Sequence, residues 1–112
     1  MSRIHGDVPY GTLDLMILKT LHARGPLHGF GLAREIEQVA ENLIQLNQGS
    51  IYPALVRLHQ QGWIKADWGV SDSNRRAKFY SLSPTGRKQL GIEVENWKRT
   101  SLVVGRFLAM ES

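Results

Sequence analysis

The side chains best suited to ligand chemistry lie between residues 47 and 82. The first group offers polar side chains within one short segment: Gln48, Ser50, Tyr52 and Arg57. The second group is cationic: Arg75, Arg76 and Lys78. Arginine pairs bidentately with guanine and glutamine with adenine, whereas serine, tyrosine and clustered cations more often hold phosphates. Together these residue types indicate a surface that contacts a nucleic-acid duplex.

Charge is distributed unevenly along the chain. Residues 47–88 carry seven Lys and Arg against two Asp and Glu, a net of plus five. Residues 1–46 carry four against five, and residues 89–112 carry three against three. The formal net charge of +4 therefore comes from the middle stretch. Because a DNA duplex carries a negative charge about every 1.7 Å, that stretch would be drawn to it.

A helix is expected to position the polar group. Ser50 is its predicted N-cap, Gly62 ends it, and apolar residues at i, i+4 and i+7 form its buried stripe. Pro53 is expected in the first turn, where the missing N–H has no helical partner. The predicted outward face comprises Tyr52, Pro53, Val56, Arg57, His59 and Gln60. That face would enter a major groove, unless Tyr52 packs on the core and Arg57 is merely solvated.

A two-stranded ribbon is expected to position the cations. From Ile64 the apolar period becomes two, residues 71–74 form a polar turn, and residues 75–82 return as the second strand. The predicted inner face of the first strand is Ile64, Ala66, Trp68 and Val70. The pattern leaves open which of Phe79 and Tyr80 faces inward. The cations beside the turn would lie along a DNA backbone or enter a minor groove, or would only promote solubility or protect a strand edge.

Two more helices precede this unit. Residues 1–11 are predicted to be an arm, after which Thr12 caps a strongly apolar, buried helix. A second, amphipathic helix starts at His28 or Gly29, and its predicted buried stripe is Leu32, Ala33, Ile36, Val39 and Ala40. His28 could reach a phosphate, because helix N-termini attract anions, or could be merely structural. Residues 43–46 are a candidate third strand of the ribbon.

The last helix is expected to start at Ser83 and Pro84 and to carry a heptad seam. The seam comprises Leu90, Val94, Trp97, Ser101, Val104 and Leu108. Such a seam has no partner within a protomer closed by the ribbon, so it predicts a homodimer. The expected fold class is mainly α with a small β-ribbon: a winged helix-turn-helix domain over residues 1–83 and a C-terminal dimerisation helix over residues 84–112.

Several motifs follow one another in a specific order: GTLDLMIL (11–18), GPLHGFGLAREIE (25–37), GSIYPALVRLHQQGWI (49–64), the pair Trp68 and Gly69, RRAKFYSLSPTGR (75–87) and ENWKR (95–99). In this order they resemble the PadR-type transcriptional regulators, and the smaller subgroup with a short C-terminal helix in particular. The resemblance implies a homodimeric repressor that covers a pseudo-palindromic DNA operator and is released by a small effector or stress signal. Phe30 stands where the family more often has tyrosine, and Trp63 where leucine is usual.

The resemblance also implies an effector site. In multidrug-sensing members of the family, a tryptophan in this segment and its mate from the other subunit sandwich flat aromatic ligands. The E-x-W pattern at residues 95–97 matches, which makes Trp97 a candidate, with Val94 and Met16 as neighbours. The alternative is that Trp97 simply fills a dimer core, since large aromatic side chains dominate interfaces.

Other classes of function find little support. The absence of cysteine excludes thiolate metal sites and thiol catalysis, and the four histidines are too scattered for a metal site, so no metal or cofactor is expected. Neither a nucleophile arrangement nor a phosphate-binding glycine loop is present, so the protein is not expected to be an enzyme. Nothing in the sequence resembles a secretory signal or a membrane span, which predicts a cytoplasmic location. The alternatives are a winged-helix protein-interaction module and a non-specific DNA-coating protein.

Overall fold

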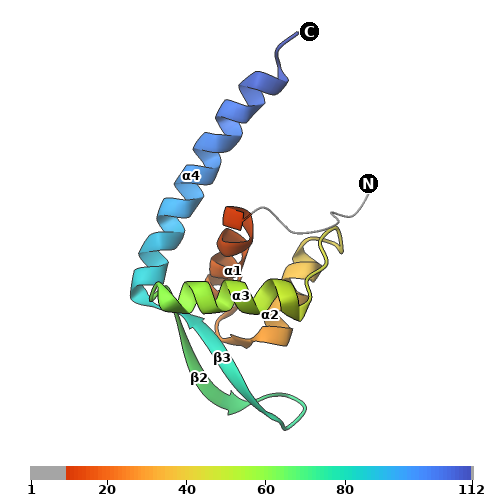
Figure 1. Ribbon diagram of the computed structural model, residues 1–112, viewed down its shortest axis with the longest axis vertical. Coiled ribbons are helices and arrows are strands. Elements are labelled where there is room, and N and C mark those ends of the chain that lie inside the picture. The colour runs from red at the N-terminus through yellow and green to blue at the C-terminus, as the bar shows by residue number, and fades with distance from the viewer. Residues whose placement is uncertain (1–9, 112) are drawn as a thin grey trace.

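The computed structural model describes residues 10–111, and over these residues it consists of helices around a small sheet (Figure 1). The elements in order are α1 (Tyr10–Arg24), β1 (Leu27–His28), α2 (Gly29–Val39), α3 (Gln48–Gln60), β2 (Ile64–Val70), β3 (Arg76–Leu82) and α4 (Pro84–Leu108). The predicted fold class, mainly α with a small β-ribbon, is confirmed. Most of the predicted N-terminal arm lies outside the described residues. The prediction that Thr12 is an N-cap is wrong, because α1 begins two residues earlier.

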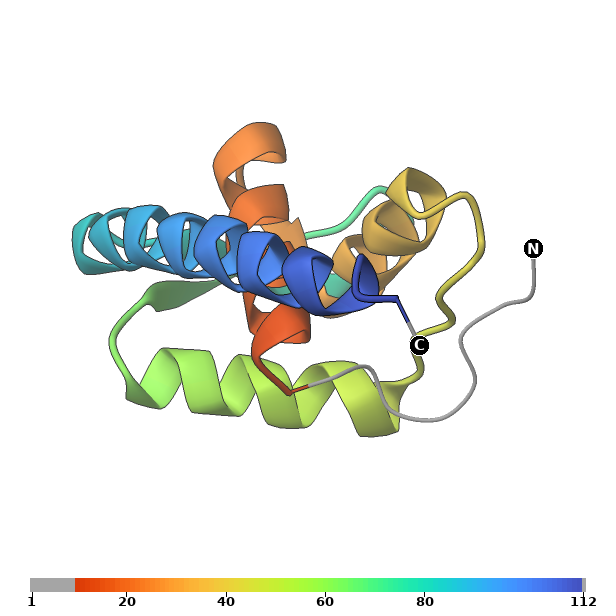
Figure 2. The same cartoon turned by 90° about the horizontal axis from the view of Figure 1, so that it is seen from above.

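Helix α1 runs through the middle of the compact head formed by α1, α2, α3 and the base of the sheet (Figures 1 and 2). It contacts α2, α3, α4 and β3. The largest fully buried side chains come from α1, α2, α3 and β2: Ile17, Leu18, Leu32, Ile51, Leu55, Leu58 and Ile64. One apolar core therefore holds α3 in place beneath its exposed face. The predicted buried stripe of α2 is wrong at Val39, whose residue surface is 67% exposed because it lies at the end of the helix, beyond the core.

The sheet has the strand order β1-β3-β2, with antiparallel pairing throughout. The third strand is thus β1, and the expectation that residues 43–46 supply it is wrong. Glu41 and Asn42 adopt left-handed backbone angles, with φ of 52° and 62°, and turn the chain after α2. The Leu46 N–H then donates to Glu37 Oε2 at 2.9 Å instead of joining the ladder.

The ribbon of β2 and β3 extends beyond the head, which explains its burial pattern (Figure 1). Tyr80 faces inward and is only 8% exposed, whereas Phe79 lies on the opposite face. On β2, Ile64 is buried, but Trp68 and Val70 are exposed. The predicted inner face therefore contributes to the core only near the base of the ribbon. We call residues 64–82, with their turn, the wing.

Helix α4 starts where the sequence predicts. Ser83 is its N-cap: Ser83 Oγ accepts from the Gly86 N–H at 2.9 Å and donates to the Gly62 carbonyl at 2.6 Å. Leu90 is only 6% exposed and belongs to the core of its own protomer, with Val94 packed against that core. The assignment of Leu90 to a dimer interface is therefore wrong, because contact with α1 already covers this first part of α4.

The outer part of α4 projects away from the head (Figure 1). All side chains described from residue 95 onward are exposed, including the remaining seam residues Trp97, Ser101, Val104 and Leu108. None of the helices within residues 10–111 is long and apolar enough to cross a membrane.

Candidate nucleic-acid interface

Helix α3 begins two residues before its predicted cap. Asn47 is the N-cap, and its Oδ1 accepts from the Ser50 N–H at 3.0 Å, so the prediction that Ser50 caps the helix is wrong. Ser50 lies in the first turn, with its Oγ 3.3 Å from the same Asn47 oxygen. Pro53 consequently falls in the second turn rather than the first. Its ring lacks the N–H that an ordinary residue at this position would donate to the Gly49 carbonyl.

The solvent face of α3 contains most of the residues expected there. Gln48, Tyr52, Pro53 and Val56 are exposed along its first three turns. Val56 is an apolar residue that the sequence places on this face but does not single out as a candidate contact. Its exposure offers a contact of the kind that reads thymine methyl groups.

Arg57 is the exception on α3. Its Nη2 lies 2.5 Å from Asp14 Oδ1 on α1, and the side chains of Arg57 and Asp14 are only 27% and 14% exposed. The prediction that Arg57 faces outward is therefore wrong, because an acidic partner on the central helix draws the guanidinium toward the head. The pair braces α3 against α1.

Tyr52 lies against the beginning of α2. A Cβ atom built on Gly29 would sit 3.0 Å from Tyr52 Oη, so the close approach depends on a glycine at the start of α2. Burial raises the pKa of the Tyr80 hydroxyl, and the neighbouring Tyr52 raises it further. The Tyr80 phenol therefore stays protonated while Tyr52 presents its ring and hydroxyl at the surface.

His28 caps α2, as its predicted position at the helix start suggested. Its Nδ1 accepts from the Gly31 N–H at 3.0 Å. The hydrogen of the neutral ring is then on Nε2, which can donate to a phosphate. The ring also contacts Phe79 edge-on, with centroids 5.5 Å apart, and this contact ties the start of α2 to the wing.

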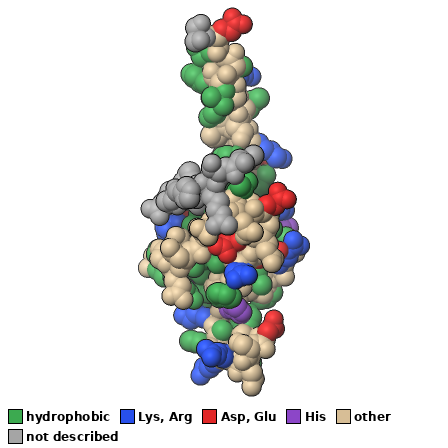
Figure 3. All heavy atoms as spheres, turned by 90° about the vertical axis from the view of Figure 1, so that its right-hand side faces the viewer, with side chains coloured by type: hydrophobic (Ala, Val, Ile, Leu, Met, Phe, Trp, Pro, Cys, Tyr) green, Lys and Arg blue, Asp and Glu red, His purple; other side chains and the backbone are tan. Residues whose placement is uncertain are grey.

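The wing turn exposes the three predicted cations. The Ser71 N–H donates to the Arg75 carbonyl at 2.8 Å, and Asn74 takes a left-handed backbone with φ of 59°. Arg75 lies in this turn, while Arg76 and Lys78 are on β3. All three side chains are exposed. Basic side chains gather at the wing end of the molecule (Figure 3).

A concave surface lies between the wing, α3 and the start of α2. We call it the wing hollow. It encloses about 700 Å³ and is lined by His28, Gly29, Phe30, Tyr52, Val56, Trp68, Ser71, Ser73, Arg75, Arg76, Ala77, Lys78 and Tyr80. It brings together five of the predicted contact residues from three separate elements. Phe30, Val56 and Trp68 also line it, although the sequence did not single them out as candidate contacts.

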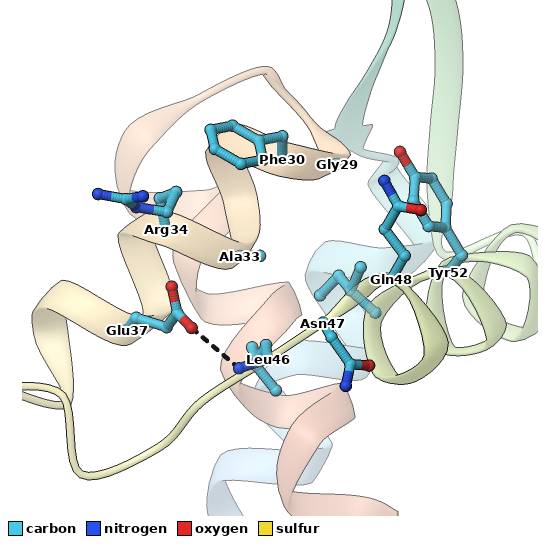
Figure 4. A pocket seen from close by; sticks show the side chains of 10 residues that line it. Gly29, Phe30, Ala33, Arg34, Glu37, Leu46, Asn47, Gln48 and Tyr52 are labelled. Atoms are coloured by element: carbon cyan, nitrogen blue, oxygen red, sulfur yellow. Dashed lines mark hydrogen bonds between the residues drawn. The ribbon is translucent and has the colours of Figure 1, made fainter.

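A second, smaller pocket lies between α2 and α3 (Figure 4). Its volume is about 250 Å³, and Gln48 and Tyr52 from α3 line it together with Phe30 and Arg34 from α2. The Arg34 guanidinium lies 5.7 Å from the centroid of the Phe30 ring. Since Phe30 and Tyr52 also line the wing hollow, the two hollows adjoin and place Gln48 beside the same concave surface.

The proposed effector residues are only partly brought together. Met16 and Val94 line an apolar pocket of about 350 Å³ between α1, α2 and α4, which also includes Val39 and Lys19. Trp97 is not among the lining residues of this pocket. Within residues 10–111, no group of three or more His, Cys, Asp or Glu side chains could hold a metal ion.

Comparison with known proteins supplies the family. Residues 17–92 match the family described as Transcriptional regulator PadR-like family. The structure of a transcriptional regulator from Clostridium thermocellum is similar, with a TM-score of 0.78 and 28% identity, over 87% of this chain and 93% of that chain. A PadR-like transcriptional regulator from Bacillus cereus has a TM-score of 0.75 and 25% identity, over 90% of this chain and 95% of that chain.

A sequence relative extends the similarity along the chain. Protein X of Lysinibacillus sphaericus, which is uncharacterised, is 26% identical over 94% of this chain and 95% of its own length. The match to the family covers more than half of the chain and includes α2, α3 and the wing. The chain therefore belongs to the PadR-like family of transcriptional regulators and is not an enzyme.

Proposed function

We propose that this regulator is a sequence-specific DNA-binding repressor that acts as a homodimer on a pseudo-palindromic operator. The observation that carries the proposal is the wing hollow, where three exposed cations share a concave surface with the exposed Tyr52 and Val56 of α3. A duplex backbone is a convex, negatively charged ridge, so its shape and charge match that surface.

Helix α3 would enter the major groove with its N-terminal turns nearest the bases. Gln48 is suited to adenine, and Val56 to a thymine methyl group. Ser50, Tyr52 and Pro53 would border the backbone on either side of these contacts. Because Arg57 is held by Asp14, its role in this proposal is to fix the angle of α3 rather than to read a base.

The wing would supply the backbone contacts. Arg75, Arg76 and Lys78 are exposed cations on or beside the turn, and His28 Nε2 is the donor on the opposite wall of the wing hollow. Phosphate contacts fix position and register and supply much of the affinity, whereas they carry no sequence information directly. These residues therefore account for affinity, and α3 for specificity.

The outer part of α4 supports the homodimer. Its exposed large apolar residues beyond Val94 are Trp97, Leu102, Val103, Val104, Phe107 and Leu108. Large exposed apolar patches mark interaction sites. A second copy of the chain carries the same apolar surface, so a symmetric dimer would bury both surfaces against each other. The interface we propose consists of Trp97, Ser101, Val104 and Leu108, with Val94 at its inner border. Two heads joined in this way would reach successive major grooves about 34 Å apart.

Release from DNA would follow a change in the angle between the two heads. The candidate ligand is a flat aromatic effector, bound at Trp97 with Val94 and Met16 beside it. We also propose that the protein is located in the cytoplasm, where the chromosome is accessible. Trapping the dimer in different inter-head geometries tests the release mechanism. Equal operator affinity in every trapped geometry would refute it.

The test of the proposed function is a salt titration of duplex binding. Footprinting upstream of the regulator's own gene identifies an operator, and fluorescence anisotropy then compares it with a random duplex of equal length. We expect a steep fall of log K with log salt and a preference for the operator of about 10³ or more. Equal affinity for both duplexes would indicate a non-specific coating protein. Absence of duplex binding would instead favour the protein-interaction module.

A further inference from the structure

Trp68 is exposed, which is unusual for tryptophan, the largest of the side chains. It lies on β2 near the end of the wing and is 61% exposed. A large apolar ring that leaves the core usually serves a contact, since exposure forgoes the stabilisation that burial would give it. The core around Ile64 and Tyr80 is complete without it. The surroundings of the ring therefore indicate its role.

Two cations lie over the Trp68 ring. In the antiparallel register, Trp68 is directly opposite Lys78, and Val70 is opposite Arg76, so all four side chains share one face of the ribbon. The Arg76 Cζ lies 4.8 Å from the ring centroid, and the Lys78 Nζ lies 5.8 Å from it. Both distances are within the range of cation–π attraction. Arg75, which lies in the turn, is not over this ring.

The opposite face of the ribbon fixes the direction of Trp68. A Cβ atom on Gly69 would lie 2.8 Å from Phe79 Cδ1, so the Phe79 ring covers this glycine. Phe79 in turn contacts the His28 ring at the start of α2. The Phe79 ring thus attaches one face of the ribbon to the head. Trp68, Arg76 and Lys78 lie on the other face and line the wing hollow.

We infer that Trp68 is a positioning residue for DNA recognition: its ring holds Arg76 and Lys78 over the wing hollow, where they meet phosphates of one duplex strand. The inference rests on the proposed function. Long cationic side chains lose rotamer freedom when they contact a phosphate, and ordering them beforehand on a ring reduces that loss. The planar guanidinium of Arg76 is especially suited to stacking on an aromatic face.

The experiment is a double-mutant cycle in operator affinity, measured by anisotropy on the full dimeric protein. Trp68→Leu should weaken operator binding about tenfold, because each of two wings loses a cation–π contact of modest strength. Trp68→Phe, which keeps an aromatic face, should retain most of the affinity. In an Arg76→Ala background the effect of Trp68→Leu should shrink to about twofold or less.

Arg75→Ala is the matched control background. It also removes one wing cation, but the full tenfold effect of Trp68→Leu should persist in it, because Arg75 does not share the ring. The same loss in both backgrounds would overturn the inference, as would wild-type affinity for Trp68→Leu. Trp68→Thr, a second variant with a strand-forming side chain, repeats the cycle if the leucine variant folds poorly. If the wild-type protein does not bind the duplex at all, the proposed function fails instead.

Discussion

Asp14 and Arg57 join the central helix to the helix that borders the wing hollow. The two charged groups are 2.5 Å apart and mostly covered, which distinguishes them from the exposed pair of Lys98 and Glu95 at 3.9 Å. Exposed pairs contribute little to stability, whereas a covered, hydrogen-bonded pair leaves an uncompensated charge when one partner is removed. This ion pair therefore adds a polar contact between α1 and α3 to the apolar core that holds α3.

Arg57→Ala should therefore lower the free energy of unfolding by about 1–3 kcal/mol, measured by urea denaturation. Gln60→Ala, a truncation of an exposed residue on the same helix, is the control and should change stability by no more than about 0.5 kcal/mol. Unchanged stability of Arg57→Ala, together with lost preference at a single operator position, would contradict the bracing role. Arg57 would then be a base contact.

Tyr80 makes the free energy of unfolding depend on pH in the alkaline range. Burial, and then the neighbouring Tyr52, raise its pKa above the ordinary 10.0. Between the unfolded and folded pKa values the folded state binds more protons, so the stabilising contribution is complete below pH 10.0 and is lost as the pH rises through the folded pKa. The free energy of unfolding should fall more steeply above pH 10.0 in the wild type than in Tyr80→Phe. Parallel curves for the two proteins would contradict the raised pKa.

At the scale of elements, the start of α4 is fixed by a close backbone contact. A Cβ atom on Gly86 would lie 1.8 Å from the Trp63 carbonyl oxygen, which no side-chain movement can relieve. The Ser83 hydroxyl bonds both the Gly86 N–H and the Gly62 carbonyl at this junction. The junction therefore sets the direction in which α4 leaves the wing.

Gly86→Ala should destabilise the head by about 3 kcal/mol or more, because the Trp63 backbone must shift. Gly91→Ala is the matched control in the same helix, with no atom within 4 Å of the added Cβ. It should stabilise the protein by about 0.5–1 kcal/mol, since alanine favours the helix. Thermal unfolding separates the two results. Similar effects of both substitutions would show that the junction is not tight.

Sequence patterns predicted the larger elements and the wing but not the contacts between them. Periodicity identifies a face of a helix, yet it does not reveal that Asp14, far away in the chain, lies beside Arg57 and draws it inward. Asn47 and Ser50 are both good caps, so local preference alone does not decide between them. A strand of two residues, such as β1, is too short to show a period. Each of these features depends on tertiary neighbours.

The sequence predicted most of the residues of the candidate site, but it predicted their arrangement less well. The charge excess identified the wing cations, and the structure brings them into one hollow with Tyr52 and His28. Trp68 was assigned to an inner stripe because period two does not show where the ribbon leaves the core. Leu90 and Trp97 fit one heptad seam, yet the seam divides into a part that packs inside the protomer and a part that is exposed.

At the scale of the whole molecule, the inner and outer parts of α4 have different roles. The inner part of α4 packs on α1 and completes the head, while the outer part projects beyond it (Figure 1). The molecule measures 57 × 32 × 21 Å, and its long dimension follows this projecting helix (Figure 1). A change in the outer part should therefore affect assembly without unfolding the head.

Val104→Asp tests this separation. Val104 is exposed in the protomer, so the carboxylate should leave the thermal unfolding of the head nearly unchanged. In the proposed dimer the same carboxylate is desolvated against its own copy, which should shift sedimentation toward the monomer. Operator affinity should then fall about 100-fold or more, because the second head no longer gains from the effective concentration that the first one provides.

Arg106→Ala is the control for charge, since it also changes the net charge of each protomer by minus one. Arg106 lies at helical spacing from Glu95 and Arg99, on a polar stripe away from the proposed interface. Its variant should stay dimeric and lose only the small affinity that general charge provides. Equal losses in both variants would mean that Val104→Asp acts through charge alone. A monomeric Val104→Asp with full operator affinity would show that one head suffices, because no linked second contact would then be contributing to binding.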